Sequence, residues 1–174
     1  MMEKTTKKLL LAYALAAVGG VLLHFLYQWL PNPVLALISP VRESVWEHVK
    51  LLYFPLLAVS LILGRGKGLG RAPWLLGTVA ACAVMLGAGY LYHVLFQGES
   101  LAVDFVLFLL PLALGFLLPR SLWPLTEWPG TEKAAWVLAG LLGGLIVWFT
   151  FFPPDTALFA DLSDAVRTFL TIPV

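Results

Sequence analysis

The sequence predicts an all-α, polytopic membrane protein with five transmembrane helices. Of its 174 residues, 60% are hydrophobic and only 12% are charged, whereas soluble domains carry about a quarter charged residues. The hydrophobic residues form five runs that are long enough, as helices, to cross about 30 Å of hydrocarbon. These runs are 9–29, 45–63, 73–95, 101–118 and 134–152. We interpret residues 1–174 as a single transmembrane domain.

A proline-rich connection joins the first two helices. The run 9–29 is longer than the apolar core of a signal peptide and has no small-x-small cleavage site after it, so we expect an uncleaved first helix. In the connection 30–44, Ser39 is a favoured N-cap and Pro40 suits the first helical position. We therefore expect the second helix to begin there, one turn before its apolar run.

The later connections are shorter. Residues 64–71 are rich in glycine and basic residues. Because no strand precedes them and the Walker spacing is absent, we interpret them as a turn rather than a phosphate-binding loop. Residues 97–100 join the third and fourth helices. After two prolines, residues 153–174 form an outer C-terminal segment, in which apolar residues at helical spacing predict a short surface helix.

Basic residues predict the orientation in the membrane. Eight of the eleven Lys and Arg residues lie before the first helix or in alternate connections: Lys4, Lys7, Lys8, Arg65, Lys67, Arg71, Arg120 and Lys133. The positive-inside rule then predicts a multi-pass protein of the cell membrane with a cytoplasmic N-terminus and an extracytoplasmic C-terminus. A net charge of +1 makes nucleic acid an unexpected partner. The expected partners are membrane lipids, and a homo-oligomer remains an open alternative.

One nine-residue pattern occurs twice, each time at the end of an apolar run. The two copies are Gly20-Val-Leu-Leu-His24-Phe-Leu-Tyr-Gln28 and Gly89-Tyr-Leu-Tyr-His93-Val-Leu-Phe-Gln97. Because His and Gln are costly inside a bilayer, their recurrence predicts two equivalent helices that face one polar site. A parallel repeat of two helical hairpins would make His48 the counterpart of Asp104. The alternative is a chance match within apolar sequence.

These polar residues lie at the predicted outer helix ends and suit a metal site. Gly20 and Gly89 lie one turn before the first and last histidines and indicate close helix contact, so the imidazoles should point into the bundle. Three imidazoles and one carboxylate fit a tetrahedral divalent metal such as zinc. The expected metal ligands are His24, His48, His93 and Asp104.

Two other interpretations of the same residues remain open. Helix ends at a membrane interface are naturally polar, and a histidine there often only hydrogen-bonds a neighbouring helix. Alternatively, His24 and His93 could ligate haem, with the adjacent glycines making room for the macrocycle.

The densest polar segment begins at Ser39 and reads Ser-Pro-Val-Arg-Glu-Ser-Val-Trp-Glu-His-Val-Lys. In this segment the chain resembles an uncharacterised family of small multi-spanning bacterial membrane proteins, mostly from Gram-positive lineages. The hallmark of that family is Ser-Pro-Val-x-Glu-Ser-Val-Trp-Glu-His-x-Lys, and Arg42 stands where an asparagine is usual. The resemblance implies the multi-spanning fold and the importance of this segment, but it implies no reaction.

The segment also supplies candidate catalytic and binding residues. Glu43 and Glu47 are four residues apart and would share one face of a helix, where either could orient a metal ligand or act as general base. The expected ligand-binding residues are Ser39, Ser44, Trp46 and Lys50. The alternative is a well-capped interfacial helix whose outer face carries salt bridges.

The sequence thus predicts a protein that binds or processes a ligand at a polar site in the extracytoplasmic leaflet. One class is a metal-dependent hydrolase or transferase acting on lipid head groups, with a metal-bound water as nucleophile. The other class is a transporter or channel subunit for a cation, a proton or a small solute. Transport sites tend to lie near the bilayer midplane, and these residues lie nearer one surface, which favours the first class.

Overall fold

The computed structural model describes residues 2–65 and 69–162. Within them the fold is all-helical, and five helices are long and apolar enough to cross a membrane. The five candidate spans are Thr6–Trp29, Val45–Leu63, Ala72–Leu95, Leu101–Glu127 and Thr131–Phe151. The predicted fold class is confirmed, and each of the five predicted apolar runs overlaps one of these spans. The fourth span extends beyond its predicted end at 118 because helix α6 (Leu101–Leu122) continues into the 3₁₀ helix η2 (Trp123–Glu127).

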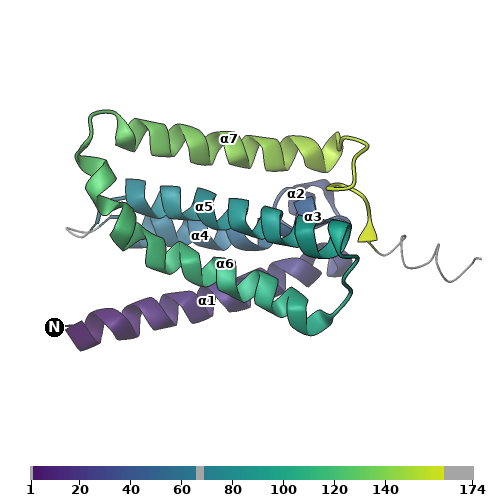
Figure 1. The fold of residues 1–174 in the computed structure, drawn as a ribbon, viewed down its shortest axis with the longest axis horizontal. Helices are drawn as coiled ribbons and strands as arrows, with labels where there is room; N and C mark the ends of the chain where they lie inside the picture. Colours follow the sequence, from purple (N-terminus) through teal and green to yellow (C-terminus); the bar gives the residue numbers. More distant parts are fainter. Residues whose placement is uncertain (1, 66–68, 163–174) are drawn as a thin grey trace, which may run out of the picture.

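Two of the long helices form the centre of the bundle. Helix α4 (Lys50–Leu63) lies beside helix α5 (Ala72–Gly89), and these two helices contribute more buried side chains than any other pair. Helix α7 (Thr131–Phe151) packs on one side of this pair, while helix α6 and the long N-terminal helix α1 (Met2–Trp29) pack on the other (Figure 1). The wall of any cavity between α1 and α6 therefore also includes α4 and α5.

The second span begins at Val45 as predicted, but no helix precedes it from Ser39. After the short helix α2 (Pro33–Ala36), the backbone is irregular until Ser44, whose side chain accepts a hydrogen bond from the Glu47 amide and caps helix α3 (Val45–His48). The prediction of a helix start at Ser39 is therefore wrong. The stronger signal was the capping pattern Ser44-x-x-Glu47, since a serine followed three residues later by a glutamate marks an N-terminus.

The third span changes its helical form near its end. Helix α5 continues into a π-helix, η1 (Tyr90–Leu95), which carries His93. π-helical turns are rare and occur frequently at functional sites. The first copy of the repeated sequence pattern is regular α-helix within α1, so the two copies differ in backbone form. The hairpin repeat stays a prediction.

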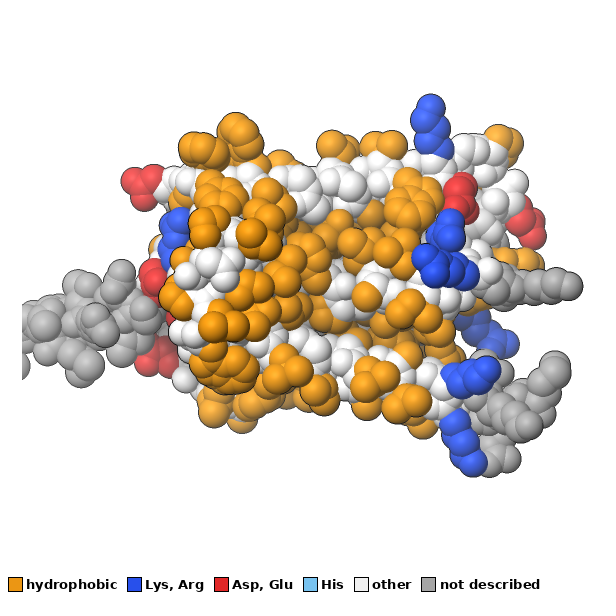
Figure 2. All heavy atoms as spheres, turned by 180° about the vertical axis from the view of Figure 1, so that it is seen from behind, with side chains coloured by type: hydrophobic (Ala, Val, Ile, Leu, Met, Phe, Trp, Pro, Cys, Tyr) orange, Lys and Arg blue, Asp and Glu red, His pale blue; other side chains and the backbone are white. Residues whose placement is uncertain are grey.

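The surface of the bundle matches its apolar composition. Figure 2 shows hydrophobic side chains covering most of one face, with Lys and Arg gathered mainly at one end of the long axis. Large side chains such as Leu10, Leu15 and Leu110 are more than half exposed. Such a surface is stable in hydrocarbon, where exposed leucine costs no hydration free energy.

Candidate functional site

The polar segment 39–50 is held in place by a buried ion pair. Lys50 is fully buried, and its ammonium donates to Glu47 Oε2 at 2.7 Å, to the Ala36 carbonyl at 2.7 Å and to the Ser39 carbonyl at 3.1 Å. Glu47 also accepts from the Val41 amide and from the Thr150 hydroxyl of α7. Every donor of the lysine is satisfied, which is the condition under which a buried charge is tolerated.

The other predicted binding residues of the segment also have packing or hydrogen-bonding roles. The Ser39 hydroxyl donates to the Leu23 carbonyl and accepts from the Tyr27 amide, which joins the loop to α1. Trp46 is buried against the Phe149 ring. The ligand-binding assignments of Ser39, Ser44, Trp46 and Lys50 stay predictions without support from the cavity described below, because none of these side chains lies in its wall.

Glu43 and Glu47 were expected on one helix face, and this prediction is wrong. Glu43 precedes the N-cap Ser44 and lies in the irregular connection. Glu43 Oε2 lies 3.3 Å from Nε2 of His48, and its side chain is 39% exposed. The hydrogen bond with His48 lowers the pKa of Glu43 below its ordinary value, against the opposing effect of burial. Glu43 therefore stays an acceptor for a cation at neutral pH.

His48 has one ring nitrogen fixed and the other facing the carboxylate. Its Nδ1 lies 2.7 Å from the Ser44 carbonyl oxygen. A carbonyl only accepts, so Nδ1 must carry the proton and donate. In the neutral ring Nε2 then presents a lone pair towards Glu43. Two acceptors facing each other at 3.3 Å require a cation between them or a proton on the ring.

His24 completes a group of three candidate ligands. The His24 ring on α1 lies 5.4 Å from the His48 ring, centroid to centroid, and its Nδ1 is buried without a hydrogen-bond partner. One ligand atom from each of His24, Glu43 and His48 can be chosen so that all three lie within 4.8 Å of one another. The three residues come from different segments, yet they could hold one metal ion.

A second histidine–carboxylate pair has the same arrangement. Nε2 of His93 lies 3.3 Å from Oδ1 of Asp104, and its Nδ1 lies 3.0 Å from the Gly98 carbonyl. The Asp104 Oδ1 atom is buried without a hydrogen-bond partner. The four residues predicted as metal ligands thus divide into two groups among the described residues: His24 and His48 join Glu43, while His93 and Asp104 contact each other.

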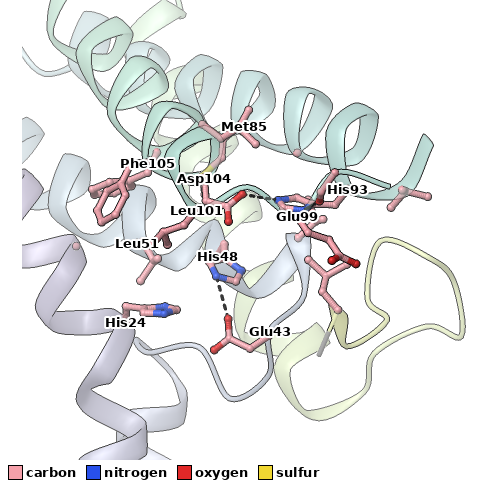
Figure 3. Close-up of a pocket in the computed structure, with 18 of the residues that line it drawn as sticks. His24, Glu43, His48, Leu51, Met85, His93, Glu99, Leu101, Asp104 and Phe105 are labelled. Atoms are coloured by element: carbon pink, nitrogen blue, oxygen red, sulfur yellow. Dashed lines mark hydrogen bonds and ion pairs between the residues drawn. The ribbon is translucent and has the colours of Figure 1, made fainter. Parts of the chain in front are cut away.

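Both groups line one cavity of about 620 Å³ (Figure 3). The wall includes the five polar residues named above, the exposed Glu99, and apolar side chains from α1, α4, α5 and α6: Val21, Phe25, Leu51, Met85, Leu101, Phe105, Leu107 and Phe108. A site of this size, mostly apolar with a few convergent polar groups, is typical of small-molecule binding. Five of the six polar residues expected to converge, all except Glu47, therefore line one cavity.

The glycines before the two histidines serve helix contact. A side chain at Gly20 would overlap the Phe108 ring and the Leu51 carbonyl, and one at Gly89 would meet Val45. The expectation that these glycines mark close contact is confirmed. Because neighbouring helices fill the space beside both glycines, the space that the haem alternative needed there is already taken.

Three features of the site were missed in the sequence. Thr150 was not identified as a partner of Glu47, and no local signal could reveal a contact across 103 residues. Residues 157–162 close one side of the cavity through backbone hydrogen bonds with Glu43 and Trp46. In the outer segment, residues 153–161 form turns and bends, and Leu162 is helical. Most of the predicted surface helix falls on residues 163–174, which lie outside the described structure.

Comparisons with known proteins give one match. No curated protein and no solved structure matches the chain. A family model described as a family of unknown function, DUF6512, matches residues 1–166. This match agrees with the expected membership of an uncharacterised family, and we conclude that the chain belongs to the family of unknown function DUF6512.

Proposed function

We propose that this protein is a membrane-embedded metalloenzyme that binds one divalent ion, with zinc the best fit, through His24, Glu43 and His48. The observation that carries the proposal is the convergence of these three ligand types within 4.8 Å at the wall of a cavity. Two imidazoles and one carboxylate form the ligand set of many catalytic zinc sites. Such a site keeps its fourth position for water or substrate.

The geometry around His48 and Glu43 supports metal binding. Ligand bonds near 2.05 Å at tetrahedral angles separate two ligand atoms by about 3.3 Å, and the His48 and Glu43 atoms are 3.3 Å apart. The Nδ1 contact of His48 with the Ser44 carbonyl is the outer hydrogen bond that metal-binding histidines commonly make. The unpartnered Nδ1 of His24 carries a desolvation cost that a partner would remove.

The reaction class that fits this site is hydrolysis or group transfer. When bound, zinc would lower the pKa of a coordinated water to about 7 and supply a nucleophile at neutral pH. We assign Glu43 to the ligand set rather than to proton transfer. The Glu47 carboxylate accepts hydrogen bonds from the Lys50 ammonium, the Val41 amide and the Thr150 hydroxyl, so it is not free to accept a proton from the cavity. The His93–Asp104 pair is the better candidate for the general base.

Elemental analysis of the purified protein tests the metal assignment. After zinc loading and dialysis in detergent, wild type should retain about one zinc per chain. Glu43→Ala and His48→Ala should lose it, whereas Glu99→Gln, which changes an exposed carboxylate at the same cavity, should retain it. Thermal unfolding of each variant identifies any that fail to fold. Wild type without stoichiometric zinc, or a folded Glu43→Ala protein that retains it, would overturn the assignment.

An activity assay tests the reaction class independently. A panel of chromogenic carboxylic esters and phosphodiesters presented in detergent micelles should include at least one that the wild type hydrolyses. Activity should disappear with a chelator, return with zinc, and fall at least 10²-fold in His93→Ala if this residue is the general base. Hydrolysis that persists fully in chelator would argue against the metalloenzyme. No hydrolysis of any compound in the panel would argue against the reaction class.

We also propose that the cavity lies in the extracytoplasmic leaflet. Lys8, Arg71 and Arg120 are at or near the helix ends far from the cavity, in line with the basic end of the surface in Figure 2. The positive-inside rule then supports a cytoplasmic N-terminus and an outer cavity. A cysteine introduced at Gln97, an exposed residue beside the cavity, should react with a membrane-impermeant thiol reagent in intact cells. A cysteine introduced at Arg120 should not, and the reverse pattern would refute the orientation.

A further inference from the structure

The wall of the cavity has two chemically different kinds of lining. The polar lining is the His24, Glu43 and His48 group together with the His93–Asp104 pair, while Leu51, Met85, Phe105 and Phe108 line the wall with hydrocarbon (Figure 3). A small polar solute would gain nothing from the apolar part, because burying hydrocarbon against a hydrated group gives no favourable transfer free energy. The wall is complementary to an amphiphile with a polar end and an apolar end.

Helices α1 and α6 contact each other at Gly20 and Phe108, which line the cavity, and at Tyr13 and Leu109, which do not. The Phe108 ring fills the space at Gly20, and the Tyr13 hydroxyl donates to the Leu109 carbonyl. Closer to the outer ends, both helices contribute residues that line the cavity and are also exposed at the protein surface: Val21 (40% exposed), Phe25 (38%), Leu101 (70%) and Phe105 (49%). From these shared residues we place a side opening of the cavity between α1 and α6.

This opening faces hydrocarbon rather than water. All four exposed wall residues are apolar and lie within candidate membrane spans. The cavity also reaches the surface at its outer end, where Gln97, Glu99 and Ala157 are exposed. One side of the cavity thus borders the acyl chains of the bilayer, and the other borders the aqueous phase.

We infer that the cavity takes a membrane glycerophospholipid laterally between α1 and α6, with its head group at the His24, Glu43 and His48 group and its acyl chains passing over Phe25 and Phe105 into the bilayer. This inference rests on the proposed function for the reaction, although lipid entry itself does not require a metal. A cavity of about 620 Å³ accepts a head group and the first part of the acyl chains but not a whole two-chain lipid, so most of each chain must remain outside.

The arrangement brings the two reactants from opposite sides. The lipid ester would enter from the bilayer, and water would enter from the outer mouth near Glu99. In hydrolysis, water oxygen forms the new bond to the acyl carbon or phosphorus, and the bond from that atom to the leaving oxygen breaks. The proton lost by water passes through the His93–Asp104 pair to the leaving oxygen, so atoms and charge balance without any further reactant.

Photo-crosslinking in nanodiscs tests lateral entry. The probe is phosphatidylglycerol with a diazirine on its acyl chain, present as a minor component of phosphatidylcholine nanodiscs that contain the wild-type protein. Peptide mapping should place the labels mainly on residues 20–25 and 101–108. Labels spread evenly over all exposed helices would mean ordinary boundary lipid and would overturn the inference.

Matched tryptophan variants sharpen this test. Val21→Trp fills the opening and should reduce labelling of residues 101–108 several-fold, whereas Val18→Trp, equally apolar and 56% exposed but outside the cavity wall, should leave it unchanged. Phe105→Trp and its control Val106→Trp repeat the comparison on α6. Each variant should keep wild-type zinc content and unfolding temperature. Equal labelling in folded Val21→Trp and Val18→Trp would refute entry through this opening.

The proposal of lateral lipid entry and the proposal of a metal site can be refuted independently in these experiments. If zinc binds but labelling is even, the proposed metal site stands and lateral lipid entry falls. If labelling concentrates at the opening but no zinc binds, the lipid site stands and the metalloenzyme falls. Water-soluble glycerophosphoglycerol, which has the same head group without chains, should not compete with labelling. Full competition by it would show that the acyl chains contribute nothing.

Discussion

Lys50 Nζ lies 2.7 Å from Glu47 Oε2, and both side chains are almost completely removed from the surface. The pair joins three parts of the chain, because the lysine also binds carbonyls before the helix and the glutamate also binds Thr150 on α7. The pair holds the connection that carries Glu43 against the helix that carries His48. It is therefore the support of the candidate metal site rather than part of it.

Lys50→Met should strongly destabilise the protein. Removing the ammonium leaves the Glu47 carboxylate buried without its cation, and breaking a buried pair in this way typically costs about 3–5 kcal/mol. The double variant Lys50→Met/Glu47→Gln removes both charges and should recover part of the loss. Thermal unfolding in detergent measures both, with exposed Lys133→Met as control. A Lys50→Met protein as stable as wild type would contradict the structural role.

Ser44→Ala should destabilise the start of α3 by about 1 kcal/mol, because the Glu47 amide loses its capping acceptor. Ser44→Asp should retain most of the stability, since aspartate is an equally good N-cap. Ser39 does not cap a helix and lies buried against α1, so Ser39→Asp should be no better than Ser39→Ala. These four variants can be compared by thermal unfolding. Rescue by aspartate at position 39 rather than 44 would support a helix start at Ser39.

The fold could be predicted from the sequence because hydrocarbon imposes one simple condition. A run of about 20 apolar residues has to form a helix to satisfy its backbone in a bilayer, and this condition identified all five spans. The start of α3 was missed because both serines fit an N-cap: Ser39 is followed by Pro40, and Ser44 is followed three residues later by Glu47. The choice between them depends on Ser39 bonding to Leu23 in another helix, which no local pattern contains.

The candidate site could be predicted only in outline. Polarity at the helix ends indicated which residues would converge, and five of them line one cavity. Their pairing could not be derived, because it depends on rotations of α1 and η1 that packing at Gly20 and Gly89 determines. Glu43 was expected beside Glu47 on one helix face, yet the late start of α3 turns it to His48 instead.

Acid should remove the stabilisation that Glu43 provides. The bond with His48 lowers the pKa of Glu43 in the folded state, so this carboxylate stabilises the fold above the ordinary glutamate pKa of about 4.3. The contribution is lost as the pH falls through the lowered pKa. With chelator present, the difference in unfolding temperature between wild type and Glu43→Gln should be largest near pH 6 and should close towards pH 3. A difference independent of pH would refute the prediction.

Zinc affinity should fall as the pH is lowered from about 7.5 to 5.5. Metal ligands must be deprotonated, and histidine protonates near pH 6.5. Two imidazole ligands should therefore release more than one proton per zinc bound in acid, whereas a single histidine ligand would release at most one. Competition with a fluorescent zinc chelator at each pH measures the slope. A slope unchanged in His24→Ala would remove that residue from the ligand set.

Gly20→Ala should be destabilising although alanine is the better helix former. A Cβ at this position would lie 2.6 Å from the Phe108 ring and 2.7 Å from the Leu51 carbonyl oxygen, and because the carbonyl belongs to the backbone of α4, the helices must separate. Such overpacking typically costs about 1–3 kcal/mol. The neighbouring Gly19→Ala is the matched control, since nothing lies within 4 Å of its Cβ, and it should be neutral or slightly stabilising. Equal unfolding temperatures for the two variants would mean that α1 does not rest on α4 and α6 at Gly20. If the contact exists, Gly20→Ala should also weaken zinc binding, because the displaced α1 carries His24 away from His48.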